Sequence, residues 1–212
     1  MEKEYLILKL SGTLQAWGKH TYEDYRPTHL FPTRSGLLGL LAACLGLNRE
    51  DLVSQNALNK SVSLAVRADD NDRDIPISII TDFHTIQGVP KASGAINAYA
   101  VITKREYLCD AQFTVALEFR AEASYNLAAV AEAVKNPFYT PFLGRRSCPC
   151  SRPLFDQVVQ ANSLNEALAQ TPPHKGISYS EVAPQTNYQC IQVRDVPQFK
   201  NRQFNKRVVY IY

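Results

Sequence analysis

Ser35-Gly36-Leu37-Leu38-Gly39-Leu40-Leu41-Ala42-Ala43-Cys44-Leu45 is apolar on nearly every side, as expected of a helix packed between other elements. A hydroxyl residue at its start and Gly46 just after its end supply cap chemistry. Gly36 and Gly39 lie one turn apart, which would let this side of the helix approach another backbone closely. The longest apolar stretch, 36–47, is shorter than the ~18 residues of a membrane span. These residues therefore predict a buried helix and no membrane partner.

Alternating apolar side chains predict strands on both sides of this helix. Leucines occupy one face of Tyr5–Leu10, and the same period of two residues recurs twice further on. The two later strands are marked by these side chains: Val62, Leu64 and Val66, then Phe113, Val115, Leu117 and Phe119.

Two further helices and two final strands complete the pattern. Leu127, Val130, Ala131 and Val134 follow helical spacing, with Ser124 as the expected cap and Pro137 as the stop. Ser163 and Glu166 predict a capping box for a short helix. The expected last strands are Cys190–Val193 and Val208–Ile211.

This order predicts an α+β protein with a ferredoxin-like core. Between two of its strands, a long insertion at about 75–110 contains the strand-like pieces 77–80 and 99–102, which indicates an extended hairpin. We expect one domain over residues 1–161, with residues 162–212 packed on it as a C-terminal β extension. The fold presents an open sheet face, which RNA-recognition modules use for nucleotides, although a fold alone does not determine function.

The charge is small but unevenly distributed. The 212 residues carry a formal net charge of +3, yet residues 133–153 and 196–212 each contain four cationic residues and no acid. Segregated basic stretches can present a surface for a polyanion. They can equally form an ordinary solvated surface.

The cysteines and histidines give little support for a cofactor or metal. Five cysteines cannot all pair within one chain, and no signal peptide is recognisable, so we expect free thiols in a cytoplasmic protein. Cys148 and Cys150 are separated by one residue, whereas zinc sites usually have two or more. The histidines, all expected in polar loops, are His20, His29, His84 and His174. One of them paired with Lys104 or a tyrosine could still activate a 2′-hydroxyl.

Leu143-Gly144-Arg145-Arg146-Ser147 is the best candidate for phosphate binding. Gly144 permits a left-handed turn and a close approach by a phosphate. Arg145 and Arg146 offer forked donors that match phosphate oxygens, Ser147 adds a hydroxyl, and Phe142 could stack on a base. The alternative is that both arginines merely face solvent.

Two other segments have related chemistry. Arg34 and Ser35 stand at the start of the buried helix, where free N–H groups attract anions, although an ordinary helix cap would look the same. Lys104 precedes Arg105 and Tyr107, which fall on one face of a strand. A cation beside an aromatic ring can bind a phosphate and stack a base, or it can be part of a salt-bridged strand end.

Four blocks resemble the CasD family of Cascade subunits from type I-E CRISPR systems. They occur in the family's order and cover nearly the whole chain: Leu14-Gln15-Ala16-Trp17-Gly18, Phe31–Leu41, Arg105-Glu106-Tyr107-Leu108-Cys109-Asp110-Ala111 and Tyr139–Pro149. Two segments depart from the pattern. Phe142 stands where the family often has tyrosine, and residues 89–97 have little similarity to the family.

The resemblance implies a RAMP fold, which is a ferredoxin-like core with a protruding β-hairpin thumb. It implies a non-catalytic subunit, without cofactor, that caps the 5′ handle of the mature CRISPR RNA. The expected partners are that RNA, the large PAM-reading subunit and the backbone subunit, with target DNA contacted indirectly through the thumb. The implied RNA contacts are Arg105, Tyr107, Arg145 and Arg146, followed by Gln15, Trp17, Arg34, Ser35, Lys104, Phe142 and Ser147, with Lys91 and His84 in the thumb.

Two alternatives remain open from the sequence. A related branch of the family cuts precursor RNA, so the chain could be a metal-independent endoribonuclease that processes CRISPR repeats. It could also be a pure protein-interaction subunit whose basic stretches bind nothing.

Overall fold

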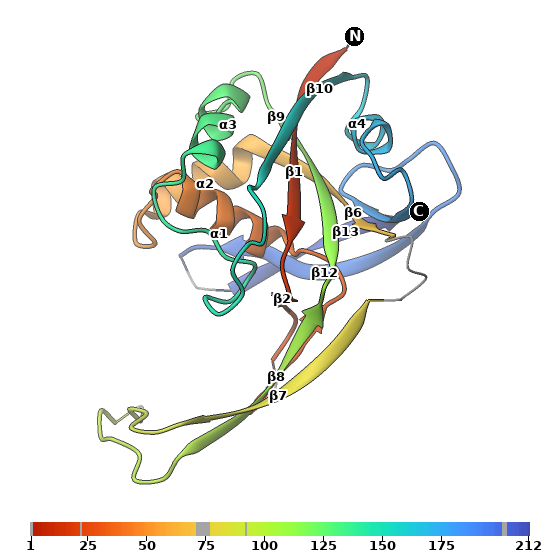
Figure 1. Cartoon of the computed structure of the whole chain (residues 1–212). Coiled ribbons are helices and arrows are strands. Elements are labelled where there is room, and N and C mark those ends of the chain that lie inside the picture. Colours follow the sequence, from red (N-terminus) through yellow and green to blue (C-terminus); the bar gives the residue numbers. More distant parts are fainter. Residues whose placement is uncertain (1, 22, 71–76, 92, 201–202) are drawn as a thin grey trace.

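A seven-stranded antiparallel sheet forms the centre of the protein, as the computed structural model in Figure 1 shows. The structure describes residues 2–21, 23–70, 77–91, 93–200 and 203–212. The sheet has the order β10-β1-β9-β6-β11-β13-β12. Its strands are β1 (Lys3–Ser11), β6 (Val62–Asp69), β9 (Gln112–Phe119), β10 (Phe155–Ala161), β11 (Gly176–Ser180), β12 (Gln189–Gln198) and β13 (Gln203–Ile211). The strands expected from alternating side chains are all present, and most are longer than their apolar cores.

Four helices lie on the two faces of this sheet in the described part of the chain: α1 (Arg34–Cys44), α2 (Leu52–Ser61), α3 (Leu127–Lys135) and α4 (Leu164–Gln170). The sequence did not suggest α2, whose side chains are mostly polar. The expected cap of α3 is wrong, because Asn126 rather than Ser124 accepts the hydrogen bond from Ala129 N. The Ser163 cap of α4 is confirmed by the bond that its hydroxyl accepts from Glu166 N, at 3.1 Å.

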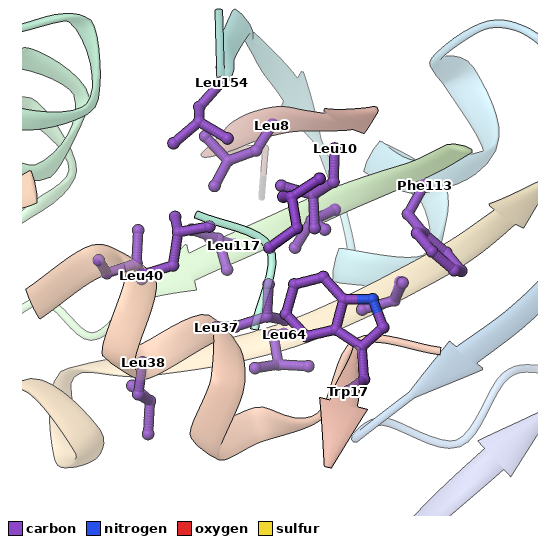
Figure 2. Close-up of a cluster of buried hydrophobic side chains, with 14 of the residues drawn as sticks. Leu8, Leu10, Trp17, Leu37, Leu38, Leu40, Leu64, Phe113, Leu117 and Leu154 are labelled. Atoms are coloured by element: carbon purple, nitrogen blue, oxygen red, sulfur yellow. The ribbon is translucent and has the colours of Figure 1, made fainter. Parts of the chain in front are cut away.

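The main hydrophobic core lies between the sheet and helices α1 and α3. Figure 2 shows Leu37 and Leu40 of α1 facing strand side chains such as Leu117, with the indole of Trp17 beside them. Gly36 is needed here because a Cβ on it would lie 2.8 Å from the Trp17 ring. The glycine therefore makes room for a side chain and not for a second backbone as expected. Gly39 has nothing within 4 Å of its missing Cβ.

Helix α4 covers part of the opposite sheet face. Its Leu164 and Leu168 pack on Tyr5, Ile7 and Ala116. The expectation of an open sheet face is therefore wrong for strands β1, β6 and β9. The face that remains open lies further along the sheet.

A long hairpin protrudes from the body (Figure 1). It consists of β7 (Ser78–Ile86) and β8 (Val101–Cys109), paired from Ser78↔Cys109 to Ile86↔Val101. The beginning of the expected insertion at 75–76 lies outside the described residues. At its base, β8 also pairs with β2 (Leu14–Gln15) and, in parallel, with β4 (Tyr25–Arg26). A separate pair is formed by β3 (Trp17–Gly18) and β5 (Thr28–His29), so the segment between β1 and α1 contains several short strands.

The C-terminal segment is anchored to α1 by buried charges. Arg34 donates to both carboxylate oxygens of Glu181, at 2.6 and 2.8 Å, and its backbone N–H donates to Asp195 at 2.7 Å. Arg207 of β13 forms ion pairs with the same two acids. Strands β11, β13 and β12 thus extend the main sheet and are tied to the first helix.

The five cysteines differ in burial. The structure has all five as free thiols, with Cys44 and Cys148 buried and Cys190 exposed. Burial raises the pKa of the Cys44 thiol to about 11.

We expect Cys190 to react first with a thiol reagent near pH 8, and Cys44 to react only after unfolding, since the thiolate is the nucleophile. The raised folded pKa of Cys44 implies a stability contribution that is complete below its unfolded pKa of about 8.5. This contribution is lost as the pH rises from there toward 11. Mass spectrometry of labelled peptides and urea unfolding at several pH values measure both effects. Equal labelling of Cys44 and Cys190 in the folded protein would contradict the burial argument.

Candidate functional site

The loop Leu143–Cys148 is held by its two ends. The side chains of Leu143 and Cys148 are fully buried, and Leu143 N donates to Cys148 O at 2.8 Å. Leu143 O accepts from Ala16 N at 3.1 Å, which ties the loop to the segment between β2 and β3. Between these anchors, Arg146 and Ser147 are exposed. The loop is a firmly anchored turn that presents its tip to solvent.

Gly144 is required by the path of this loop. Its φ of +86° lies in the left-handed region, and a Cβ would lie 1.7 Å from the carbonyl oxygen of Ala16. No side chain fits there without moving the backbone. The close approach inferred from the sequence is real, but it is an approach to Ala16 and not to a phosphate.

Arg145 braces the loop against the base of the hairpin. Its guanidinium donates to the carbonyls of Glu106 at 3.0 Å and Arg26 at 3.1 Å. It also stacks over the ring of Tyr107, with 4.5 Å from the guanidinium carbon to the ring centroid. Three of its contacts are thus internal, and the guanidinium joins β4 to β8. This side chain is half-buried and positions the cations around it.

The arrangement brings in one arginine that the sequence did not suggest. Arg26 in β4 is the register partner of Arg105 in β8, and its carbonyl is held by Arg145. Its strand has two residues, too short for any periodic signal. The only indication in the sequence is that Arg26 follows an aromatic residue, Tyr25, just as Arg105 is close to Tyr107.

The other candidates on the loop and on β8 differ in exposure. Lys104 and Arg146 are exposed, Phe142 is 38% exposed and Arg105 is half-buried, with its Nε 3.0 Å from Thr103 Oγ1. We call Arg26, Arg105 and Arg146, together with Phe142 and Ser147, the basic surface. These side chains come from β4, β8 and the loop, which lie together only in the folded chain. Lys104 follows Thr103 and precedes Arg105 in β8, so its side chain lies on the opposite face of the hairpin.

The basic surface has acids close to it. Glu106 is occupied internally, because it accepts from Tyr25 Oη and, at 2.9 Å, from Thr28 N. The hydrogen bond to Glu106 raises the pKa of the Tyr25 hydroxyl. Asp82 is exposed and lies opposite Arg105 in the hairpin. The local field is therefore cationic but partly balanced.

Gln15 and Trp17 are corrected from contact residues to supporting residues. Both side chains are completely buried. Trp17 Nε1 donates to Gln15 Oε1 at 3.1 Å, and Gln15 Nε2 donates to Ala111 O at 2.6 Å. A side chain without exposed surface cannot contact a ligand in this conformation. Tyr107 is nearly as buried, at 7% exposure, and its ring supports the guanidinium of Arg145 that stacks over it.

Arg34 is corrected in the same way. The residue is 7% exposed, and its guanidinium donates hydrogen bonds to Glu181, to Asn59 and to the carbonyl of Val62. The anion expected at the start of α1 is already present as the carboxylate of Asp195. Ser35 is half-buried in the same turn.

The remaining candidates lie along the hairpin. Lys91 is exposed near its tip, where its N–H donates to Ala95 O. His84 lies opposite Thr103, whereas Lys104 lies opposite Phe83, so His84 and Lys104 point to opposite faces of the hairpin. The pairing of His84 with Lys104, one of those considered for a nuclease, is not formed. Within the described residues, no three His, Cys, Asp or Glu side chains form a group that could hold a metal ion.

The chemistry available here is binding of a polyanion. Arginine forks and an ammonium suit phosphate oxygens, and a partly exposed phenylalanine suits a base. Because Arg145 joins the loop to the backbone of β4 and β8, these three segments are held together before a ligand arrives, which reduces the entropic cost of binding.

The sequence is similar to known CRISPR-associated proteins. Residues 5–210 match the family described as CRISPR-associated protein (Cas_Cas5). The chain is 44% identical over 214 aligned positions to the CRISPR system Cascade subunit CasD of Escherichia coli (strain K12), covering 99% of this chain and 96% of that protein.

Two solved structures are also similar. A chain of a CRISPR RNA-guided surveillance complex is 29% identical, with a TM-score of 0.75 and coverage of 98% of this chain and 89% of that chain. A structure described as a Cas protein is 30% identical, with a TM-score of 0.67 and coverage of 98% and 93%.

We expect Gly144→Ala to lower the free energy of unfolding by on the order of 1–3 kcal/mol, because a left-handed backbone and a contact with Ala16 O must both be relieved. Gly18→Ala is the matched control, since nothing lies within 4 Å of its missing Cβ. Urea unfolding of both variants measures the difference. Equal stability of the two variants would show that the loop tolerates a side chain at 144.

Proposed function

The chain belongs to the CRISPR-associated Cas5 family, and on this premise we propose that it is the non-catalytic subunit that caps the 5′ handle of the CRISPR RNA in a Cascade-type complex. The observation that carries the proposal is the Arg145 brace. It holds the loop, β4 and β8 in one rigid arrangement with Arg146 and Lys104 directed to solvent.

In this proposal the cations of the basic surface contact phosphates and Phe142 stacks on a splayed base. Arg26, Arg105 and Arg146 supply affinity that falls as salt increases, and Ser147 supplies a hydroxyl near the same phosphates. Lys104 adds a proposed phosphate contact on the other face of β8. Specificity comes from unstacked bases and 2′-hydroxyls. Arg145, Tyr107, Gln15 and Trp17 act by holding these groups in place.

The fold fits the same role. The strand order β10-β1-β9-β6 with two crossover helices corresponds to the ferredoxin-like arrangement, so we assign residues 1–161 to a RAMP domain and 162–212 to a C-terminal extension packed on it. The β7–β8 hairpin is the proposed thumb. Lys91 at its tip and His84 along it are the proposed contacts with neighbouring strands of the guide–target duplex, and thereby with target DNA.

The hairpin also supports the proposed protein partners. Phe83 is 62% exposed, Tyr99 82% and Ile96 70%. Large apolar side chains gathered on one element usually mark an interaction site. We assign this surface to the neighbouring backbone subunit and propose that the chain bridges it to the large PAM-reading subunit in the cytoplasm. No helix in the described part of the chain is long and apolar enough to cross a membrane.

Arg146→Ala is expected to weaken binding of the host's CRISPR repeat RNA roughly tenfold, because a charge-assisted hydrogen bond contributes about 1.5–3 kcal/mol. Fluorescence polarisation of labelled repeat RNA at fixed salt measures the change. Arg49→Ala is the matched control, because Arg49 is an exposed arginine outside the basic surface. Unchanged binding and assembly in both Arg146→Ala and Arg145→Ala would favour the pure protein-interaction role and exclude the proposed one.

We expect the purified chain to leave repeat RNA intact in the presence of EDTA, since His84 and Lys104 lie on opposite faces of the hairpin. Gel electrophoresis of incubated repeat RNA tests this. Specific cleavage by the parent chain that disappears in His84→Ala would establish the endoribonuclease instead.

A further inference from the structure

The outer face of the last two strands, β12 and β13, is not part of the basic surface and has no role so far. Along β13, Phe204, Lys206, Val208 and Tyr210 lie on one face of the strand, opposite the face of Arg207 and Val209. Their register partners in β12 are Pro197, Arg194, Gln192 and Cys190. We call these eight side chains the C-terminal face.

This face is open because α4 stops short of it. Ser180 of β11 pairs with Tyr210, and the Ser180 hydroxyl bonds to Asn165 of α4. The C-terminal face therefore continues the α4 side of the sheet beyond the helix, while Val193 and Val209 pack into the main core on the other side. Phe204 is 46% and Val208 43% exposed.

The charges on the C-terminal face are not compensated. Arg194 and Lys206 are exposed and directly opposite one another, and like charges in that position destabilise a strand pair. Neither forms an ion pair with an acid among the described residues, whereas the neighbouring Arg207 points inward and is paired with Asp195 and Glu181. None of the eight side chains is acidic. Two opposed cations without an acid favour an anionic ligand.

Aromatic rings flank the two cations. Phe204 lies one position along the outer face from Lys206, and Tyr210 lies at the other end of the face, edge-on to Tyr188 at 5.1 Å between ring centroids. Phe204 and Tyr210 are separated by roughly 20 Å of strand, at about 3.3 Å per residue. Aromatic rings alternating with cations on an open sheet suit bases and phosphates of an unpaired strand. An apolar protein surface would leave the cations desolvated and unpaired.

We propose that the C-terminal face binds single-stranded RNA as a second site, separate from the basic surface. Lys206 and Arg194 bind phosphates, and Phe204 and Tyr210 stack on bases. The choice of RNA rests on the proposed function, in which the same chain already holds one end of an RNA strand. Stacking on aromatic rings and contacts with phosphates do not distinguish one base from another, so the face accepts any base sequence, as the variable part of a guide requires.

The test compares the full chain with Arg194→Gln/Lys206→Gln for binding of labelled oligouridylate over a range of salt. We expect roughly a hundredfold weaker binding, about tenfold for each charge-assisted hydrogen bond, and a salt slope reduced by about 1.4, which corresponds to two lost phosphate contacts. Phe204→Ala is expected to weaken binding roughly five- to a hundredfold. The melting temperature of the charge variant should be unchanged or higher, since a repulsive pair is removed.

Arg49→Gln/Lys60→Gln is the matched control, because it removes two exposed cations elsewhere. An equal loss in this control, parent-like binding by the face variant, or binding of oligothymidylate without oligouridylate would each overturn the proposal. Arg146→Ala separates the two sites. If it leaves repeat RNA binding unchanged while the face variant still loses oligouridylate, the handle proposal fails and the second site stands.

Discussion

The buried ion network around Arg34 is the constraint on which the arrangement of both halves depends. Arg34 joins the start of α1 to Glu181 and, through the carbonyls of Asn59 and Val62, to the end of α2 and the start of β6. Asp195 holds the backbone N–H of Arg34 on one side and the side chain of Arg207 on the other. Removing one partner from such a network would leave a buried charge unpaired, which costs several kcal/mol. The C-terminal strands are therefore held on α1.

The same network determines which side of the C-terminal strands is free. Because Asp195 and Arg207 must point toward α1, the alternation of a strand sends Lys206 and Val208 to the opposite side. The side chains that neutralise one another lie inside, and those without a partner lie outside. An internal requirement of stability has thus produced an exposed cationic and aromatic face.

The basic surface has a similar division between bracing and contacting side chains. Arg145 is used for internal contacts with Tyr107, Glu106 and Arg26, while the adjacent Arg146 remains exposed. Two consecutive arginines in one loop thus have different roles. The internal one keeps the loop, β4 and β8 together, and the external one is available for a ligand.

The sequence by itself determined the main elements, because their signals are local. Alternation in 5–10 and 113–119 predicted β1 and β9, helical spacing predicted α3, and Gly144 predicted a left-handed turn, as its φ of +86° confirms. The resemblance to the family likewise followed from contiguous blocks. What only the tertiary structure decided was the role of each polar side chain. Arg34 and Arg146 look alike in sequence, yet one is buried among acids contributed from residues 181 and 195 and the other is exposed. Burial and pairing depend on partners far along the chain, which neither periodicity nor composition records.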